Sequence, residues 1–157
     1  MAVTRLNHAV LYVRDALAAA QFYHDALGLE TVQSLGDKAV FLRAADSAND
    51  HDLGLFAVGD QPTAAGRGLY HLAWEVQTLR ELQETAQHLA AVGALVGSAD
   101  HGASRSLYAK DLDGIEFEVM WQVPVELLSS QDVLRTAPLN LEADIARFGA
   151  DTTARVH

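Results

Sequence analysis

An internal repeat opens with the stretch LNHAVLYVRDALAAAQFYHDALGLE, residues 6–30, and returns as LYHLAWEVQTLRELQETAQHLAAVGAL, residues 69–95. Each copy has an apolar strand with histidine as its third residue, an amphipathic helix and a glycine that ends the helix. His8 and His71 occupy the same place in the two copies. The repeat therefore predicts two modules of the same design.

Capping residues and apolar spacing predict one helix in each copy. Asp15 and Thr78 stand at the N-cap positions, and Glu81 completes a capping box with Thr78. Gly28 and Gly93 are the C-terminal stops. The apolar residues at helical spacing, which need a sheet to cover, are Ala19, Phe22, Tyr23, Ala26 and Leu27 in the first helix and Leu82, Ala86, Leu89 and Ala90 in the second.

Short strand-like runs follow each helix, so each copy is predicted to fold as βαβββ. The runs are 31–35, 38–43 and 51–58 in the first copy and 95–100, 104–109 and 115–121 in the second. We expect one α+β domain over 1–157. Its parts are module one at 3–58, a linker at 59–67, module two at 68–122 and a helical tail at 123–157. The tail carries an apolar stripe of Leu141, Ile145 and Phe148, which is expected to dock on the core or on a second subunit.

Composition excludes several classes of function. The chain has 157 residues, with 21 acidic and 11 basic side chains and a net charge of −10, which argues against nucleic acid and anionic membranes as partners. With no cysteine, it has no disulfide, thiolate nucleophile or thiolate metal site. The N-terminus lacks a signal-peptide pattern, and no apolar run approaches about 18 residues. We expect a cytoplasmic protein.

Two histidines have the context of metal ligands. His8 and His71 lie among apolar strand residues at repeat-related positions, whereas His24 and His88 lie off the apolar stripes of their helices and are expected to face solvent. A lone strand histidine is more often a hydrogen-bonded core residue than a ligand. Two at equivalent positions indicate a shared purpose.

A carboxylate in the last predicted strand completes a ligand set. Glu118 lies in the strand IEFEV, and a buried carboxylate is costly without a counter-charge. Two imidazoles and one carboxylate with an open coordination face suit Fe(II), and also Mn(II) or Zn(II). Glu116 has the same strand parity, so alternation alone leaves both glutamates as candidates.

Over residues 6–121 these features resemble the vicinal oxygen chelate superfamily, which includes glyoxalases, bleomycin resistance proteins and type I extradiol dioxygenases. The resemblance implies that two βαβββ modules pair into a cupped mixed sheet with helices outside, and that the protein is a homodimer. It implies His8, His71 and Glu118 as metal ligands. Glu118 is preferred to Glu116 because the family glutamate follows a DxDG sequence by three further residues.

The stretch HGASRSLYAKDLDGIEFEVMW, residues 101–121, resembles the extradiol dioxygenase branch in particular. Leu112 stands where that pattern usually has proline, and Ala99 replaces a residue from a limited set. The segment HDLGLF, residues 51–56, resembles the one that carries the acid–base histidine of that branch, here His51. The positions that match the pattern of the longer stretch are His101, Leu107, Tyr108, Asp111, Gly114 and Glu118.

The resemblance implies an Fe(II)-dependent extradiol ring-cleavage dioxygenase that acts on a catechol-type aromatic substrate with dioxygen. Mn(II) or another divalent ion is the alternative metal. His51 would move a substrate proton, and His101 and Tyr108 would hold the substrate oxygen by hydrogen bonds. Pocket walls are expected from the residues that share the ligand face, whereas Trp74, Phe117 and Trp121 have the opposite parity and should pack beneath the helices. The expected wall residues are Val10, Tyr12, Ala73 and Met120.

Two other functions stay open on the same fold. A metal-dependent glyoxalase- or epimerase-type isomerase or lyase would use Glu75 or Glu116 as a base and would need a fourth ligand. The positions considered for that ligand carry no donor; they are Leu53, Leu55 and Ala57. A small-molecule or drug-binding resistance protein would lack the metal triad.

Overall fold

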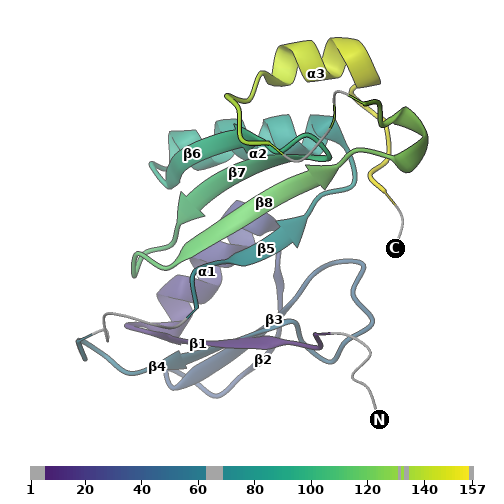
Figure 1. The fold of residues 1–157 in the computed structure, drawn as a ribbon. Coiled ribbons are helices and arrows are strands. Elements are labelled where there is room, and N and C mark those ends of the chain that lie inside the picture. The colour runs from purple at the N-terminus through teal and green to yellow at the C-terminus, as the bar shows by residue number, and fades with distance from the viewer. Residues whose placement is uncertain (1–5, 63–68, 131, 133–134, 156–157) are drawn as a thin grey trace. The chain divides into compact units, whose positions relative to one another are not determined.

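The computed structural model describes residues 6–62, 69–130, 132 and 135–155, which form two four-stranded mixed sheets, helices α1 and α2 and a C-terminal helix α3 (Figure 1). The chain divides into two compact units, residues 1–67 and residues 68–157. The predicted α+β fold, with two βαβββ modules and a helical tail, is confirmed. Most of the predicted linker lies outside the described residues. None of the described helices has the length and apolar character needed to span a membrane.

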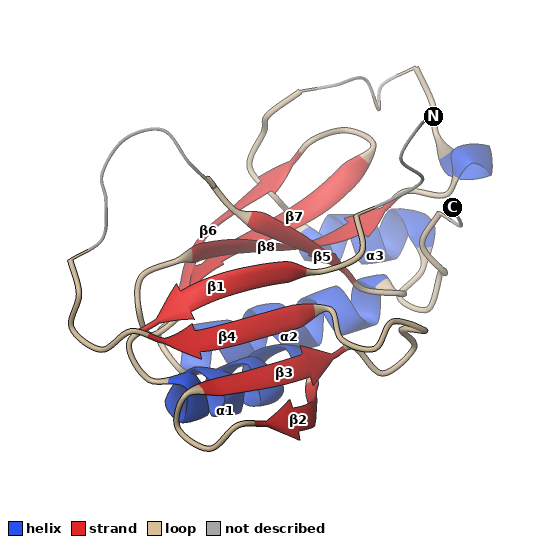
Figure 2. Ribbon diagram, turned by 90° about the horizontal axis from the view of Figure 1, so that it is seen from below, coloured by secondary structure: helices blue, strands red, loops and turns tan. Residues whose placement is uncertain are grey.

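Unit one has the strand order β1-β4-β3-β2, in which β1 runs parallel to β4 and the other neighbours are antiparallel. Figure 2 shows α1 behind this sheet. The side chains that face α1 are buried, whereas Val10 and Tyr12 on the opposite face are exposed. The elements are β1 (Ala9–Val13), α1 (Ala16–Leu27), β2 (Glu30–Ser34), β3 (Ala39–Arg43) and β4 (Leu53–Ala57).

Helix α1 begins and ends where its capping residues predict. Asp15 accepts hydrogen bonds from the backbone N–H groups of residues 17 and 18, and Gly28 ends the helix with a φ of 68°, a conformation that favours glycine. The predicted stripe is confirmed at Ala19, Tyr23 and Ala26. Phe22 and Leu27 are only half-buried, because Ala16 and Ala20 complete the buried face instead.

Unit two repeats the arrangement with the strand order β5-β8-β7-β6, in which β5 runs parallel to β8. Thr78 and Glu81 form the predicted capping box of α2. Ala90 is exposed, so the predicted stripe is wrong there; Leu79, Leu82 and Leu89 form the buried face. The elements are β5 (Leu72–Glu75), α2 (Leu79–Ala91), β6 (Leu95–Asp100), β7 (Ser104–Lys110), β8 (Glu116–Gln122), the short 3-10 helix η1 (Val125–Leu127) and α3 (Leu141–Phe148).

The tail docks on unit two, where α3 lies beside α2 (Figure 1). Phe148 packs against Trp121 with ring centroids 5.6 Å apart. The buried residue of α3, however, is Asp144, whose carboxylate lies 2.8 Å from the guanidinium of Arg105. Arg105 is only 1% exposed. An ion pair therefore anchors the tail together with the apolar contact that the sequence predicts.

Candidate functional site

Glu118 lies on the face of β8 that points away from the helices. Strand alternation places Phe117 and Val119 in the core, each 1% exposed, and Glu118 on the other side. Ala73 of β5 pairs with Glu118, and His71 precedes Ala73 by two residues on the same face. The parallel pairing of β5 with β8 thus brings His71 beside Glu118. Phe117 and Trp121 pack in the core as predicted, and Trp74 is half-buried.

The two predicted ligands of unit two are in contact. The distance from His71 Nε2 to Glu118 Oε2 is 3.1 Å, and Glu118 is 8% exposed. Two donors bound at right angles to one ion, each at about 2.1 Å, lie roughly 3.0 Å apart. A carboxylate this buried also needs a positive charge beside it. The pair is therefore spaced and charged as adjacent ligands of a divalent cation would be.

Glu116 takes a different place around the same imidazole. Its Oε1 lies 4.0 Å from Nδ1 of His71, and that nitrogen is buried without a hydrogen-bond partner. A hydrogen bond from the Tyr70 hydroxyl to Glu116 raises the pKa of Tyr70. His71 thus presents Nε2 to Glu118 and Nδ1 to Glu116, so the two glutamates have distinct positions. Tyr70 was not predicted, and nothing in the spacing of the sequence indicates it.

Tyr108 and His101 extend the cluster from the neighbouring strand. Tyr108 of β7 pairs directly with Glu118, and its ring centroid is 5.9 Å from that of His71. The Tyr108 hydroxyl lies 2.8 Å from His101 Nε2. Burial, and then the negative charge of Glu118, raise the pKa of Tyr108, which keeps the phenol protonated. Unit two thus brings together His71, Glu118, Tyr108 and His101.

In unit one, the rings of His8 and His51 are in contact, with centroids 4.5 Å apart and planes tilted by 45°. Phe41 also packs edge-on against His51, with ring centroids 5.0 Å apart. His8 Nδ1 lies 2.8 Å from the side-chain oxygen of Asn7. The Asp52 carbonyl accepts a hydrogen bond from Ala9 N–H at 2.9 Å, which holds the loop with His51 against the start of β1. The predicted acid–base histidine therefore lies beside the predicted ligand of its own module.

Asp52 stabilises that loop from within. Its carboxylate accepts hydrogen bonds from Ala44 N–H at 2.8 Å, from the Ser47 hydroxyl at 2.8 Å and from the Asn49 amide at 2.6 Å. Burial alone would raise the pKa of Asp52, but these hydrogen bonds and the nearby His51 outweigh it and lower the pKa. His51 is thus held on a loop that a part-buried polar network fixes.

Strand register corrects the sequence analysis at the fourth-ligand position. Leu53 and Leu55 are fully buried and face α1, so they were the wrong residues to consider. Val10 pairs with Gly54 in unit one as Ala73 pairs with Glu118 in unit two. Since Val10 follows His8 by two residues, as Ala73 follows His71, Gly54 is the repeat equivalent of Glu118. Module one therefore has no side chain where module two has its carboxylate.

Within either unit by itself, the described residues contain no group of three or more His, Asp or Glu side chains that could hold a metal ion. The predicted triad takes His8 from unit one and His71 and Glu118 from unit two. It stays a prediction, supported in unit two by the contact of its two ligands.

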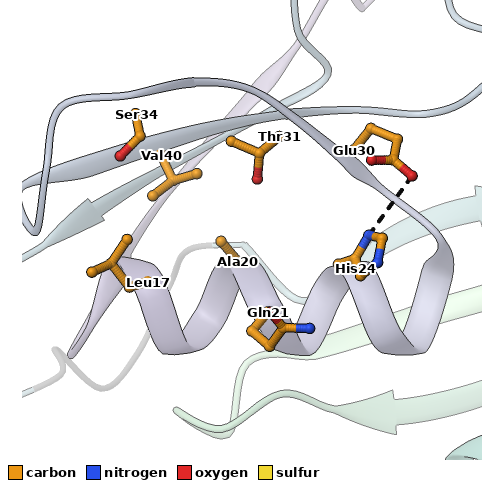
Figure 3. Close-up of a pocket in the computed structure, with 8 residues that line it drawn as sticks. All are labelled: Leu17, Ala20, Gln21, His24, Glu30, Thr31, Ser34 and Val40. Carbon is orange, nitrogen blue, oxygen red and sulfur yellow. Dashed lines mark ion pairs between the residues drawn. The ribbon is translucent and has the colours of Figure 1, made fainter.

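A separate pocket of about 430 Å³ lies between α1 and strands β2 and β3 (Figure 3). It is on the helix side of the unit-one sheet, opposite the face that carries Val10 and Tyr12. His24 and Glu30 lie at one end, 3.9 Å apart. His24 is exposed, as predicted, and so is His88. The residues that line the pocket are Leu17, Ala20, Gln21, His24, Glu30, Thr31, Ser34 and Val40, none of which was predicted to act in the site.

Comparison with known proteins identifies a matching family model and related sequences. A family model described as the Glyoxalase/Bleomycin resistance protein/Dioxygenase superfamily matches residues 5–119. Metapyrocatechase 2 of Cupriavidus necator is 31% identical over 93 residues, which cover 59% of this chain and 27% of that protein. Catechol-2,3-dioxygenase of Bacillus subtilis (strain 168) is 27% identical over 122 residues, which cover 74% and 41%. The chain spans less than half the length of these two relatives.

Solved structures share the fold. The fosfomycin resistance protein FosX from Listeria monocytogenes matches with a TM-score of 0.61 and 23% identity, over 80% of this chain and 98% of FosX. At that level of identity the likeness shows the architecture and not the activity.

Proposed function

The chain belongs to the Glyoxalase/Bleomycin resistance protein/Dioxygenase superfamily, and we propose that within it the protein is an Fe(II)-dependent extradiol ring-cleavage dioxygenase acting on a catechol-type aromatic substrate. The observation that carries the proposal is the connected set in unit two. His71 contacts Glu118 at 3.1 Å, Tyr108 pairs with Glu118 across two strands, and His101 contacts the Tyr108 hydroxyl at 2.8 Å. The names of the two catechol dioxygenase relatives point the same way.

The metal would be held by His8, His71 and Glu118. Two neutral imidazoles and one carboxylate leave a divalent ion with one net positive charge, which supplies a Lewis-acid centre with open positions for a catecholate and dioxygen. Fe(II) is the proposed ion, and the same donors also accept Mn(II) or another divalent metal. The fit rests on the donor types and on the buried carboxylate of Glu118, which needs a cation.

The remaining residues would bind and orient the substrate. Tyr108 stays protonated and can share hydrogen bonds with a phenolic oxygen of the substrate, while His101 holds the Tyr108 hydroxyl in place. His51, whose ring contacts that of His8, would accept a substrate proton and return it later, a role that histidine performs well near neutral pH. Val10 and Tyr12 would line the substrate pocket on the exposed sheet face.

The absence of a donor at Gly54 favours this proposal over an isomerase or lyase with four protein ligands. A fourth ligand would fill a coordination position that a dioxygenase needs open. Gly54, the repeat equivalent of Glu118, has no side chain to offer. Glu116, which with Glu75 is one of the two bases that an isomerase could use, is engaged by the Tyr70 hydroxyl.

The proposal is tested by loading the protein with Fe(II) without oxygen, then adding a panel of catechols and air. We expect a yellow ring-fission product and matching oxygen uptake. The matched control is Tyr108→Phe, which keeps all three proposed ligands and should turn over slowly. No product and no oxygen uptake across the panel, combined with isomerase turnover under Mn(II) or Ni(II), would replace this proposal by the isomerase.

A further inference from the structure

The tail segment 135–137 lies against the end of β6, next to His101. Asp100 N–H donates to the Ala137 carbonyl at 2.8 Å, and Ala137 N–H donates to the Asp100 carbonyl at 3.0 Å. The Arg135 guanidinium also pairs with the Asp100 carboxylate. Backbone and side-chain contacts together hold this segment beside the residue that precedes His101.

Asp100 is the centre of a larger ionic network. It accepts hydrogen bonds from Gly102 N–H at 2.7 Å and lies 2.9 Å from Arg105, which in turn contacts Asp144 of α3. Burial by itself would raise the pKa of Asp100, but its hydrogen bonds from Arg135 and Gly102 and the charge of Arg105 lower it. The carboxylate therefore stays charged at neutral pH. The turn that carries His101 is thus tied to the tail at both the segment and α3.

Two contacts of this segment reach the imidazole itself. His101 Nδ1 lies 3.1 Å from the Arg135 carbonyl oxygen. The Thr136 hydroxyl, which can donate or accept, lies 3.5 Å from the same nitrogen. The nearer carbonyl oxygen only accepts, so its contact favours a hydrogen on Nδ1. In the neutral ring, Nε2 then has a free lone pair, and it faces the Tyr108 hydroxyl at 2.8 Å.

We propose that the tail segment 135–137 is a positioning element of the candidate active site that fixes the Nδ1–H tautomer of His101. His101 Nε2 then accepts the hydrogen of the Tyr108 hydroxyl. Beside its contact with the Ser106 side chain, the Tyr108 oxygen can then accept a hydrogen bond donated by a substrate hydroxyl, a consequence that rests on the proposed function. The tail, to which the sequence assigned no role in the chemistry, determines the direction of the hydrogen bonds in the site.

The tautomer is measured directly on the ¹⁵N-labelled, metal-free protein at neutral pH, from long-range ¹H–¹⁵N correlations of the imidazole rings. His101→Gln identifies the His101 signals by their loss. We expect a protonated, pyrrole-type Nδ1 and a pyridine-type Nε2 for His101. An Nε2–H tautomer or a pair of averaged nitrogens in the wild-type protein overturns the proposal. The measurement needs neither metal nor turnover, so its failure is distinct from failure of the dioxygenase proposal.

The role of the tail is tested by Arg135→Ala, which removes the ion pair to Asp100. We expect the two His101 nitrogen shifts to move toward each other, and Arg135→Lys to restore the separation. The matched control is Arg80→Ala, which removes the exposed pair between Arg80 and Asp151 of the tail and should leave His101 unchanged. Wild-type His101 shifts in Arg135→Ala, or the same change in both alanine variants, contradict the proposal.

Discussion

At the scale of single residues, two glutamates on one face of β8 differ in their predicted roles in metal binding. Glu118 contacts His71 Nε2, whereas Glu116 lies 4.0 Å from Nδ1 of the same ring. We expect Glu118→Gln to weaken metal binding by more than about 100-fold, and Glu116→Gln to weaken it by about tenfold, since partners of a ligand matter less than the ligand itself. Anaerobic calorimetric titration with Fe(II) or Mn(II) measures both.

Without metal, Glu118→Gln should have the opposite effect and stabilise the protein. Removing the buried negative charge of Glu118 relieves a desolvation cost, so metal-free Glu118→Gln should unfold at a higher denaturant concentration than metal-free wild type. Saturating metal should then stabilise wild type alone, by about 2.7 kcal/mol at 100 times its Kd. Equal losses of affinity in the two variants would mean that Glu118 is not a ligand.

A Tyr108 variant distinguishes an effect on turnover from an effect on metal binding. Tyr108→Phe removes the hydroxyl that contacts His101 and leaves the ring beside His71. We expect kcat to fall by about 100-fold, because losing the hydroxyl that orients the substrate oxygen misplaces the reacting groups, and metal affinity to change less than about threefold. Steady-state oxygen uptake and metal titration give the two numbers. Full activity would show that the hydroxyl takes no part.

At the scale of elements, the parallel strand pairing within each module determines which residue stands at the position of a metal ligand. Gly54 occupies the place of Glu118, and a Cβ built there would lie 3.4 Å from Val10 and 3.6 Å from Phe41, which are van der Waals contacts and not clashes. We expect Gly54→Glu to tighten Mn(II) binding by about tenfold, because an added carboxylate raises the ligand charge, and to abolish oxygen uptake. Gly54→Gln is the neutral control. Unchanged affinity together with full oxygen uptake in Gly54→Glu would contradict the register argument.

Sequence patterns predict where helices and strands lie better than they predict which face of a strand is buried. The caps at Asp15 and Thr78 and the stop at Gly28 identify both helices because each has a local physical signal. Alternation in a strand shows which residues share a face but not which face is covered. For this reason Leu53 and Leu55 were considered as ligands, although their side chains lie on the buried face of β4. The pairing of Val10 with Gly54 identifies Gly54 as the equivalent position.

A second ion pair lies within the tail. It joins Asp132 and Arg147, with atoms 2.6 Å apart. Hydrogen bonds from Arg147 hold the pKa of Asp132 far below its ordinary value of 3.8. A carboxyl group with a lowered pKa stabilises the fold above its unfolded-state pKa, and that contribution is lost as the pH falls toward the folded value.

We therefore expect Asp132→Asn to lower the unfolding free energy at pH 7, by an amount that shrinks once the pH falls below about 4. Denaturant unfolding of both proteins from pH 7 to pH 2 measures it. Asp151→Asn, which removes an exposed pair with Arg80, is the control and should cost little at any pH. A difference that stays constant down to pH 2 would show that the charge of Asp132 is not what matters.

At the scale of the whole molecule, the proposed activity needs both repeats, because His8 and His51 come from unit one and the other site residues from unit two. The repeat and the resemblance supplied the predicted site residues and the proposed chemistry from residue types and spacing. They did not predict the contact from the Arg135 carbonyl to His101, because a backbone carbonyl is present at every position and leaves no signal in a sequence.

The central claim is that His8, His71 and Glu118 bind one divalent ion. Crystals of the Fe(II)-loaded protein, measured at the iron absorption edge, test it most directly. We expect one anomalous peak about 2.0–2.3 Å from an imidazole nitrogen of each histidine and from a carboxylate oxygen of Glu118. A fully loaded crystal whose iron lies elsewhere, or contacts His71 and Glu118 without His8, would contradict it.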